Sequence, residues 1–385
     1  MKSFEELYKK IEQEALKNRP RNLAADFCKN REGGGKHPLI LYGAGGNCEF
    51  AMFTCLWYGI EVTGVCDSVV TGTYRYKNQI YEIISPDELF KNYSNAFVLI
   101  TSWQFEQEIR DFLRTSGFPD TQIYFLRNPN TLTPKIFREN YLAGYQWAYK
   151  LFTDVRSRQR ILDKVRFLLL GEPCTPDSVY TEGGYFAFPD IALRENEVYV
   201  DGGAYIGDTA EEFIISMKEK GKDYRHIYSF EPDPSNYKRA VQNLSVYERI
   251  DLIPCGISSR KTELMFESSQ ETEGLGSHMM PNDISSYNSE TLTIPATSLD
   301  QFFADKPKSL WPTIIKIDIE GGEKEALIGA QNIIKAQKPQ LIVCAYHKPE
   351  DIYELPETIL KIRDDYRLSL WQIGQSFWDL ILYAI

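Results

Sequence analysis

The sequence predicts an α/β protein with two Rossmann-like parts, each a mostly parallel sheet covered by helices. Two observations predict it: short apolar runs typical of buried strands alternate with helical patterns in both halves, and a glycine-rich turn follows the first strand of each half. These turns lie in LILYGAGGNCE at 39–49 and VYVDGGAYIGDT at 198–209. At 385 residues, the chain is long enough for two domains that each bury a core.

In the first half, a charged amphipathic helix precedes the strand PLILYGAG. The alternation then predicts a helix at about 46–58, a strand at 61–68, a helix from Ser85, a strand at 96–102, a helix at 104–117 and a strand at 122–126. We assign residues 1–130 to an N-terminal Rossmann-like domain of the nucleotide-binding type. Residues 131–180 show apolar positions at helical spacing and are predicted to form a helical linker.

A second alternation begins near residue 197 and predicts a domain over residues 181–385. Its elements are, in order, the strand EVYVDGG, a helix at 208–220, a strand at 226–232, a helix at 234–245, a strand at 250–257, a hairpin around ELMFES, a strand at 313–321, a helix at 323–336 and a strand at 339–347. Two strand-like runs, RLSLWQIG and WDLILYAI, close the chain.

Composition and charge disfavour several classes of protein. The net charge of −11 argues against a nucleic-acid-binding protein, which needs a basic surface for phosphates. No apolar run approaches the ~18 residues of a membrane span, and the charged N-terminus lacks the apolar core of a signal peptide. The seven cysteines form no CxxC pair, which indicates reduced cysteines in a core. We therefore expect a soluble cytoplasmic protein.

The first glycine turn partly matches the dinucleotide-binding fingerprint GxGxxG. Gly43 and Gly45 fill its first two glycine positions, and Asp67 ends the next strand, where an acid can bind a ribose. Cys48 stands in the third glycine position and loosens the helix–strand packing around a pyrophosphate. Two interpretations stay open: a tight turn that binds no ligand, and an NAD site.

The second glycine turn begins with an acid. Asp201 ends the first strand of that half, Gly203 and Gly207 frame the turn, and a glycine lets a ligand approach the backbone closely. Glu231 ends the second strand, where a carboxylate can bind both hydroxyls of a ribose. A sulfonium and an ammonium group suit acidic neighbours, whereas a pyrophosphate needs a bare helix N-terminus. The pattern therefore favours S-adenosylmethionine over NAD.

Charged residues also mark two later strands. Lys316, Asp318 and Glu320 alternate in IIKIDIEGGE, so we expect all three on one face of a strand, where they are costly unless paired or functional. Glu323 opens the next helix, where its charge favours the helix dipole. His347 ends PQLIVCAYH at the same predicted sheet edge, and histidine is well suited to accept a proton near neutral pH.

These segments, in this order, resemble the FkbM family of S-adenosylmethionine-dependent methyltransferases. The resemblance covers roughly residues 180–385 and rests on VDGGAYIGDT, FEPDPSNYKRAVQN, PCGISS, TSLDQFF, IIKIDIEGGEKEALIGA and KPQLIVCAYH. It implies a class I methyltransferase fold, a Rossmann-like sheet of seven strands with the last one antiparallel. Residues 1–130 are loosely similar to the small Rossmann-like domains, beginning with YGAG, that precede some sugar-modifying enzymes.

The resemblance also implies a set of cofactor contacts. Carried over by position, they are Asp201, Gly203, Tyr205, Gly207, Asp208, Thr209, Glu231, Pro232, Asn236, Asp318 and Glu320. The sequence departs from the family pattern at Gly202, where an apolar residue is frequent, and at Tyr205, where a small polar residue is common. These departures leave the detailed contacts of the loop open.

We interpret the chain as an S-adenosylmethionine-dependent methyltransferase that methylates a hydroxyl of a sugar, glycan or natural product. We expect His347 to be the base, Asp318 to orient the acceptor or the sulfonium, and Lys316 to balance the charge of Asp318. The alternatives are an NAD-dependent oxidoreductase acting on a sugar nucleotide through the first turn, and a non-catalytic nucleotide-binding protein. No ligand spacing predicts a metal site, although Asp318, Glu320 and His347 could ligate an ion. The assembly state stays open, with a homodimer as one alternative.

Overall fold

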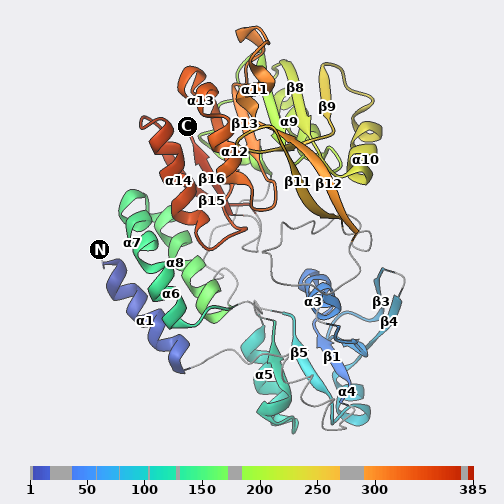
Figure 1. The fold of residues 1–385 in the computed structure, drawn as a ribbon. Helices are drawn as coiled ribbons and strands as arrows, with labels where there is room; N and C mark the ends of the chain where they lie inside the picture. The colour runs from blue at the N-terminus through green and yellow to red at the C-terminus, as the bar shows by residue number, and fades with distance from the viewer. Residues whose placement is uncertain are drawn as a thin grey trace. The chain divides into compact units, whose positions relative to one another are not determined.

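The computed structural model describes residues 3–17, 37–57, 59–77, 79–102, 105–126, 131–171, 184–268, 290–373 and 380–385 (Figure 1). Two compact units are present: one holds the described parts of 1–8, 135–165 and 177–385, and the other those of 9–134 and 166–176. Most of the predicted loop GEPCTPDS and the first residues of WDLILYAI lie outside the described residues. The predicted boundaries at 130 and 180 stay a prediction.

The smaller unit is a six-stranded sheet in the order β3-β4-β2-β1-β5-β6. Its strands are β1 (Leu39–Tyr42), β2 (Gly64–Cys66), β3 (Gly72–Tyr76), β4 (Gln79–Ile84), β5 (Phe97–Ile100) and β6 (Ile123–Phe125). Its helices are α3 (Gly46–Trp57), α4 (Pro86–Asn92) and α5 (Glu106–Thr115). Buried side chains of α3 pack on one face of the sheet, and those of α4 and α5 pack on the other. The structure thus confirms a Rossmann-like α/β unit.

One hairpin of this unit was not predicted. Strands β3 and β4 pair antiparallel, and β4 continues the sheet parallel to β2. Most of their side chains are exposed or half-buried, so the sequence lacks the apolar run that marks the central strands. The predicted start of α4 is confirmed, because Ser85 and Glu88 form a reciprocal capping box.

The larger unit contains a seven-stranded sheet in the order β15-β16-β14-β13-β7-β8-β9. The strands are β7 (Glu197–Gly202), β8 (Tyr224–Phe230), β9 (Ile250–Ile253), β13 (Ile314–Ile317), β14 (Gln340–Cys344), β15 (Leu368–Gln372) and β16 (Leu380–Ala384). Strand β16 pairs antiparallel with both β14 and β15, and the other neighbouring strands of this sheet pair in parallel. This arrangement confirms the predicted class I methyltransferase fold. A separate small sheet joins β10 (Gly256–Ile257), β11 (Thr262–Ser268) and β12 (Glu290–Thr297).

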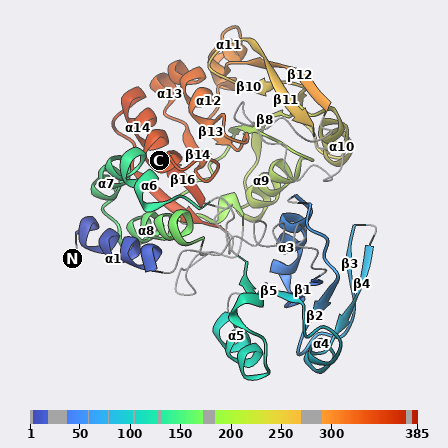
Figure 2. The same ribbon diagram turned by 60° about the horizontal axis from the view of Figure 1, so that its bottom comes forward.

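Helices cover both faces of the large sheet (Figures 1 and 2). Helices α9 (Asp208–Glu219) and α10 (Pro234–Leu244) pack on the face that carries Tyr199, Ile227 and Ile342. On the opposite face, Phe302 and Phe303 of α11 (Leu299–Phe303) contact the ring of Tyr228. Helix α11 contacts α12 (Glu323–Gly329) and α13 (Gln331–Gln337), and both of these contact α14 (Asp351–Ile362). Helix α14 was not predicted from the sequence, and α12 and α13 were predicted as one helix.

Three more helices lie between the two sheets in the sequence: α6 (Pro134–Asn140), α7 (Leu142–Leu151) and α8 (Val155–Leu170). Within the larger unit, the Tyr145 hydroxyl of α7 donates to the carbonyl of Pro349, 2.9 Å away. Lys164 of α8 donates to the carbonyl of Tyr346 at 3.0 Å. These helices therefore support the loop that follows β14. Phe4 and Tyr8 of α1 (Phe4–Lys17) pack against aromatic rings of α6 and α7. In the described part of the chain, no helix has the length and apolar character to span a membrane.

Candidate active site

The second glycine turn begins where β7 ends, and Gly203 is required there for two reasons. Its φ of +77° lies in the left-handed region. A Cβ built at this position would lie 1.8 Å from the carbonyl oxygen of Asp318, which follows β13. Gly203 was expected to let a ligand approach the backbone, but the group that approaches it here is the backbone of Asp318. Gly207 has a φ of +88° and begins α9, with Leu244 beside its missing Cβ.

A buried ion pair between Asp201 and Lys316 stabilises this turn. Asp201 and Lys316 are direct partners in the pairing of β7 and β13, and their side chains are 0% and 2% exposed. The Lys316 ammonium lies 3.1 Å from Asp201 Oδ1 and donates to the carbonyl of Gly203 at 2.7 Å. Burial alone lowers the pKa of Lys316, but Asp201 and Asp318 raise it overall, so the ammonium stays charged. Lys316 was expected to balance Asp318, whereas its ion pair is with Asp201.

Glu231 follows β8 and is almost fully buried at the carboxyl edge of the sheet. Its Oε2 accepts from the backbone NH of Tyr205 at 2.8 Å, and its Oε1 accepts from that of Asp233 at 2.9 Å. Burial raises the pKa of Glu231 to about 7, although both hydrogen bonds oppose this shift. The carboxylate is thus tied to the glycine turn, and each oxygen keeps a lone pair for a ligand.

Two tyrosines that the sequence analysis did not identify hold Asp318. The Tyr185 hydroxyl donates to Asp318 Oδ2 at 3.0 Å, and the Tyr346 hydroxyl donates to Oδ1 at 3.0 Å. Tyr185 is itself fixed, because its carbonyl accepts from Tyr383 at 2.7 Å. Nothing in the sequence places Tyr185 near Asp318, because 133 residues separate them.

His347 lies among three carboxylates at the same edge. Its Nε2 is 3.4 Å from Asp318 Oδ1 and 3.3 Å from Glu320 Oε2, and its Nδ1 is 3.1 Å from Glu323 Oε1. The His347 side chain is 8% exposed and that of Glu323 is 1% exposed. Burial lowers the pKa of His347, but Glu323, Glu320 and Asp318 raise it overall to well above its ordinary value. The predicted proximity of Asp318 and His347 is therefore present.

One expectation about this cluster is wrong. Strand β13 ends at Ile317, and Glu320 has a φ of +58° in the turn that follows, so Lys316, Asp318 and Glu320 do not share one strand face. Glu323 opens α12, as expected. Its buried Oε1 also accepts from the backbone NH groups of Ile319 and Gly321, at 3.0 and 3.2 Å, and contacts His347, which was not expected.

The remaining predicted cofactor residues surround the turn. Tyr205 has a φ of +48°, and Asp208 and Thr209 open α9. Pro232 and Asn236 flank the start of α10, where Asp233 is the N-cap and accepts from the NH of Asn236 at 2.9 Å. All of them lie at or beside the ends of β7 and β8, but their contacts with a cofactor stay a prediction.

In the first glycine turn, in the smaller unit, Asp67 accepts hydrogen bonds from backbone NH groups of the chain. Asp67 Oδ2 accepts from the NH of Ala44 at 2.7 Å, and Oδ1 accepts from Val69 and Val70 at 2.8 and 2.9 Å. These backbone donors offset the effect of burial and lower the pKa of Asp67. Gly43 has a φ of +119°, and Thr101 fills the place of its Cβ. Asp67 therefore stabilises its own turn. Gly45 has no heavy atom within 4 Å of its missing Cβ.

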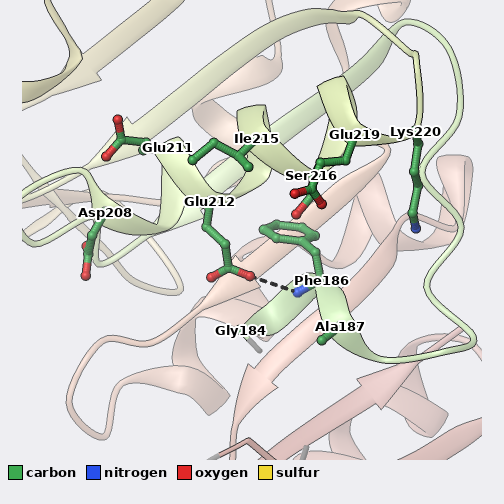
Figure 3. Close-up of a pocket in the computed structure, with 10 residues that line it drawn as sticks. All are labelled: Gly184, Phe186, Ala187, Asp208, Glu211, Glu212, Ile215, Ser216, Glu219 and Lys220. Atoms are coloured by element: carbon green, nitrogen blue, oxygen red, sulfur yellow. Dashed lines mark hydrogen bonds between the residues drawn. The ribbon is translucent and has the colours of Figure 1, made fainter. Parts of the chain in front are cut away.

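A surface pocket of about 430 Å³ lies elsewhere on the larger unit, along the outer side of α9 (Figure 3). Glu212 projects into it and accepts from the NH of Phe186 at 3.1 Å. Of the predicted site residues, Asp208 alone lines this pocket. We place the candidate site at the Glu231–Asp318–His347 edge, because the predicted cofactor and acceptor groups converge there.

Comparisons with known proteins show a likeness to methyltransferases. Residues 201–367 match the family model of the methyltransferase FkbM domain. The chain is similar to the hexuronic acid methyltransferase AglP of Haloferax volcanii, with 28% identity over 180 residues, 46% of this chain and 65% of that protein. It thus spans slightly less than two thirds of this curated relative. A solved methyltransferase FkbM from Methylobacillus flagellatus has the same fold, with a TM-score of 0.67 and 22% identity over 98% of this chain and 99% of the other.

Proposed function

We propose that the chain uses S-adenosylmethionine to transfer a methyl group to a hydroxyl of a sugar, glycan or natural-product acceptor. The match of residues 201–367 to the methyltransferase FkbM domain supports methyl transfer. The observation that carries this proposal is the convergence at one sheet edge. The glycine turn and Glu231 meet there with Asp318 and His347. The first pair supplies a cofactor cradle and the second pair an acceptor site.

In this proposal Glu231 binds the ribose hydroxyls of the cofactor. Its oxygens already accept from Tyr205 and Asp233, which fixes the carboxylate relative to the glycine turn. Asp201 is fully buried and paired with Lys316, so its contribution is to hold the turn in place. Preorganised groups of this kind speed the reaction by positioning the sulfonium methyl before the acceptor arrives.

The reaction needs little covalent help from the protein. The acceptor oxygen attacks the methyl carbon in line with the carbon–sulfur bond, that bond breaks, and S-adenosylhomocysteine leaves. The hydroxyl proton must also leave. His347 as the base stays a prediction, and the structure adds a condition to it. The surrounding carboxylates hold a proton on the ring at neutral pH, so His347 must lose that proton before it can accept another.

A sugar acceptor is supported by the relative AglP, which is a hexuronic acid methyltransferase. Oxygen as the accepting atom is supported by the clamped Asp318, because a carboxylate fixed by two tyrosines can accept a hydrogen bond from an acceptor hydroxyl. The alternative NAD-dependent reaction through the first turn stays a prediction, and Asp67 accepts three backbone hydrogen bonds there.

Calorimetry of the full chain tests the cofactor first. We expect S-adenosylmethionine and S-adenosylhomocysteine to bind with one site per chain, and NAD to give no binding heat. Methyl transfer is then measured with the tritiated methyl donor and a panel of free sugars, uronic acids, sugar nucleotides and glycans. Label in an alkali-stable ether supports the proposal. Label released by mild alkali identifies a methyl ester instead, and binding of NAD alone contradicts the assignment.

A further inference from the structure

The group around His347 has the composition of a metal site. Asp318, Glu323 and His347 each offer a ligand atom, and these atoms lie within 4.8 Å of one another. Glu320 adds a further carboxylate oxygen 3.3 Å from His347 Nε2. Cis ligands of an ion with bonds of ~2.1 Å lie about 3.0–3.4 Å apart, which is the spacing seen between the ring and its carboxylates.

A second observation is that buried polar atoms of this group lack hydrogen bonds within the described residues. His347 is nine-tenths buried, yet neither ring nitrogen makes a hydrogen bond of acceptable angle within the described residues. Oε2 of the buried Glu323 also accepts no hydrogen bond there. Buried polar atoms normally find partners, so each exception needs a cause. Three carboxylates against one imidazole also leave an excess of negative charge that a cation offsets.

We propose that His347 Nε2, Asp318 and Glu320 bind a divalent transition-metal ion. Asp318 and Glu320 lie on the Nε2 side of the ring, at 3.4 and 3.3 Å, whereas Glu323 lies on the Nδ1 side, at 3.1 Å. Glu323 therefore accepts the N–H of Nδ1 and orients the ring, as carboxylates beside metal-binding histidines commonly do. Mixed imidazole and carboxylate ligands suit Mn²⁺, Fe²⁺, Co²⁺ or Zn²⁺ better than Ca²⁺. Asp318 and Glu320 are 21% and 36% exposed, so the ion can enter from their side.

The role of the ion rests on the proposed function. Next to Asp318, it takes the acceptor oxygen as a ligand and lowers the pKa of that hydroxyl, as bound metals do for water. The proton passes to solvent, and the oxygen attacks the methyl carbon of the sulfonium while the carbon–sulfur bond breaks. His347 is then a metal ligand, and it does not act as the base.

Metal binding is tested on the full chain after dialysis against EDTA. MnCl₂ is titrated while free Mn²⁺ is followed by electron paramagnetic resonance, and ZnCl₂ and MgCl₂ are compared by calorimetry. We expect one Mn²⁺ or Zn²⁺ per chain, with Mg²⁺ much weaker. Glu323→Gln should weaken binding about 10–100-fold, and His347→Ala at least as much. Glu325→Gln, an exposed acid on the same helix, is the matched control and should bind like the wild type.

Two results would overturn the metal site. The first is a wild-type protein with no saturable Mn²⁺ or Zn²⁺ binding, and the second is binding that His347→Ala and Glu323→Gln leave unchanged. If these variants fail to fold, X-ray absorption of the zinc-loaded wild type decides, because a shell without imidazole scattering contradicts the proposal. S-adenosylmethionine binding by the EDTA-treated wild type is measured separately, so the metal site and the proposed function can fail independently.

Discussion

Replacing Gly203 with alanine tests the contact between the glycine turn and β13. Gly203 and Gly221 both have positive φ, +77° and +66°, so alanine is strained by roughly 1–2 kcal/mol at either position. The surroundings differ. A Cβ at Gly203 would lie 1.8 Å from the carbonyl oxygen of Asp318, whereas at Gly221 it meets no heavy atom within 4 Å. Gly221→Ala is therefore a matched control for the strain alone.

The steric cost at Gly203 follows from that distance. Real Cβ atoms essentially never come within 3.0 Å of another heavy atom, so the turn and the end of β13 must separate by at least about 1 Å. Overpacking of this kind adds about 1–3 kcal/mol to the strain. We expect Gly203→Ala to lower the free energy of unfolding by about 2–5 kcal/mol, against about 1–2 kcal/mol for Gly221→Ala.

Urea unfolding and calorimetry with S-adenosylmethionine measure both effects. Because the displaced turn carries the carbonyl that Lys316 binds, we expect Gly203→Ala to lose at least tenfold in cofactor affinity, whereas Gly221→Ala should keep wild-type affinity. Equal losses of stability in the two variants, together with unchanged cofactor affinity, would show that the turn does not depend on its contact with Asp318.

Three further predictions concern buried charges. Glu231→Gln should weaken S-adenosylmethionine binding by about 1–3 kcal/mol in calorimetry, because the ribose loses a charged acceptor; equal affinity would remove Glu231 from the site. Since the pKa of Glu231 is about 7 and the ionised form binds ribose better, wild-type affinity should rise several-fold from pH 6 to 8, and this rise should shrink in Glu231→Gln, which controls for titration of the ligand itself. Lys316→Met should cost about 3–5 kcal/mol in urea unfolding by leaving Asp201 buried and unpaired, and adding Asp201→Asn should recover most of it; a loss below about 1 kcal/mol would contradict a charged pair.

The sequence predicts the frame of the site because its local patterns carry the information. Asp201 lies near the end of β7, and Glu231 and His347 follow β8 and β14. The carboxyl ends of parallel strands meet at one edge of the sheet. Tyr185 was missed because its contact with Asp318 spans the fold and leaves no periodic signal.

The errors have physical causes as well. Alternation of charged residues placed Glu320 on the strand. In the structure β13 already ends at Ile317, and Glu320 lies in the turn that continues through Gly321. The contact of Glu323 with His347 was missed because sequence position alone does not reveal that its side chain is buried. Helix α14 was missed because Pro356 interrupts its pattern, although the structure keeps Pro356 inside the helix.

The support that α7 and α8 give to the loop after β14 limits how the catalytic half can be isolated. A fragment trimmed to residues 181–385 would lack Tyr145 and Lys164, which bind the carbonyls of Pro349 and Tyr346 on either side of His347. Such a fragment would retain every predicted cofactor residue. The loop that carries His347, however, would lack both of these hydrogen bonds. Shortened genes, domain exchanges and crystallisation fragments should therefore begin before α6, where the scaffold of the reaction centre starts.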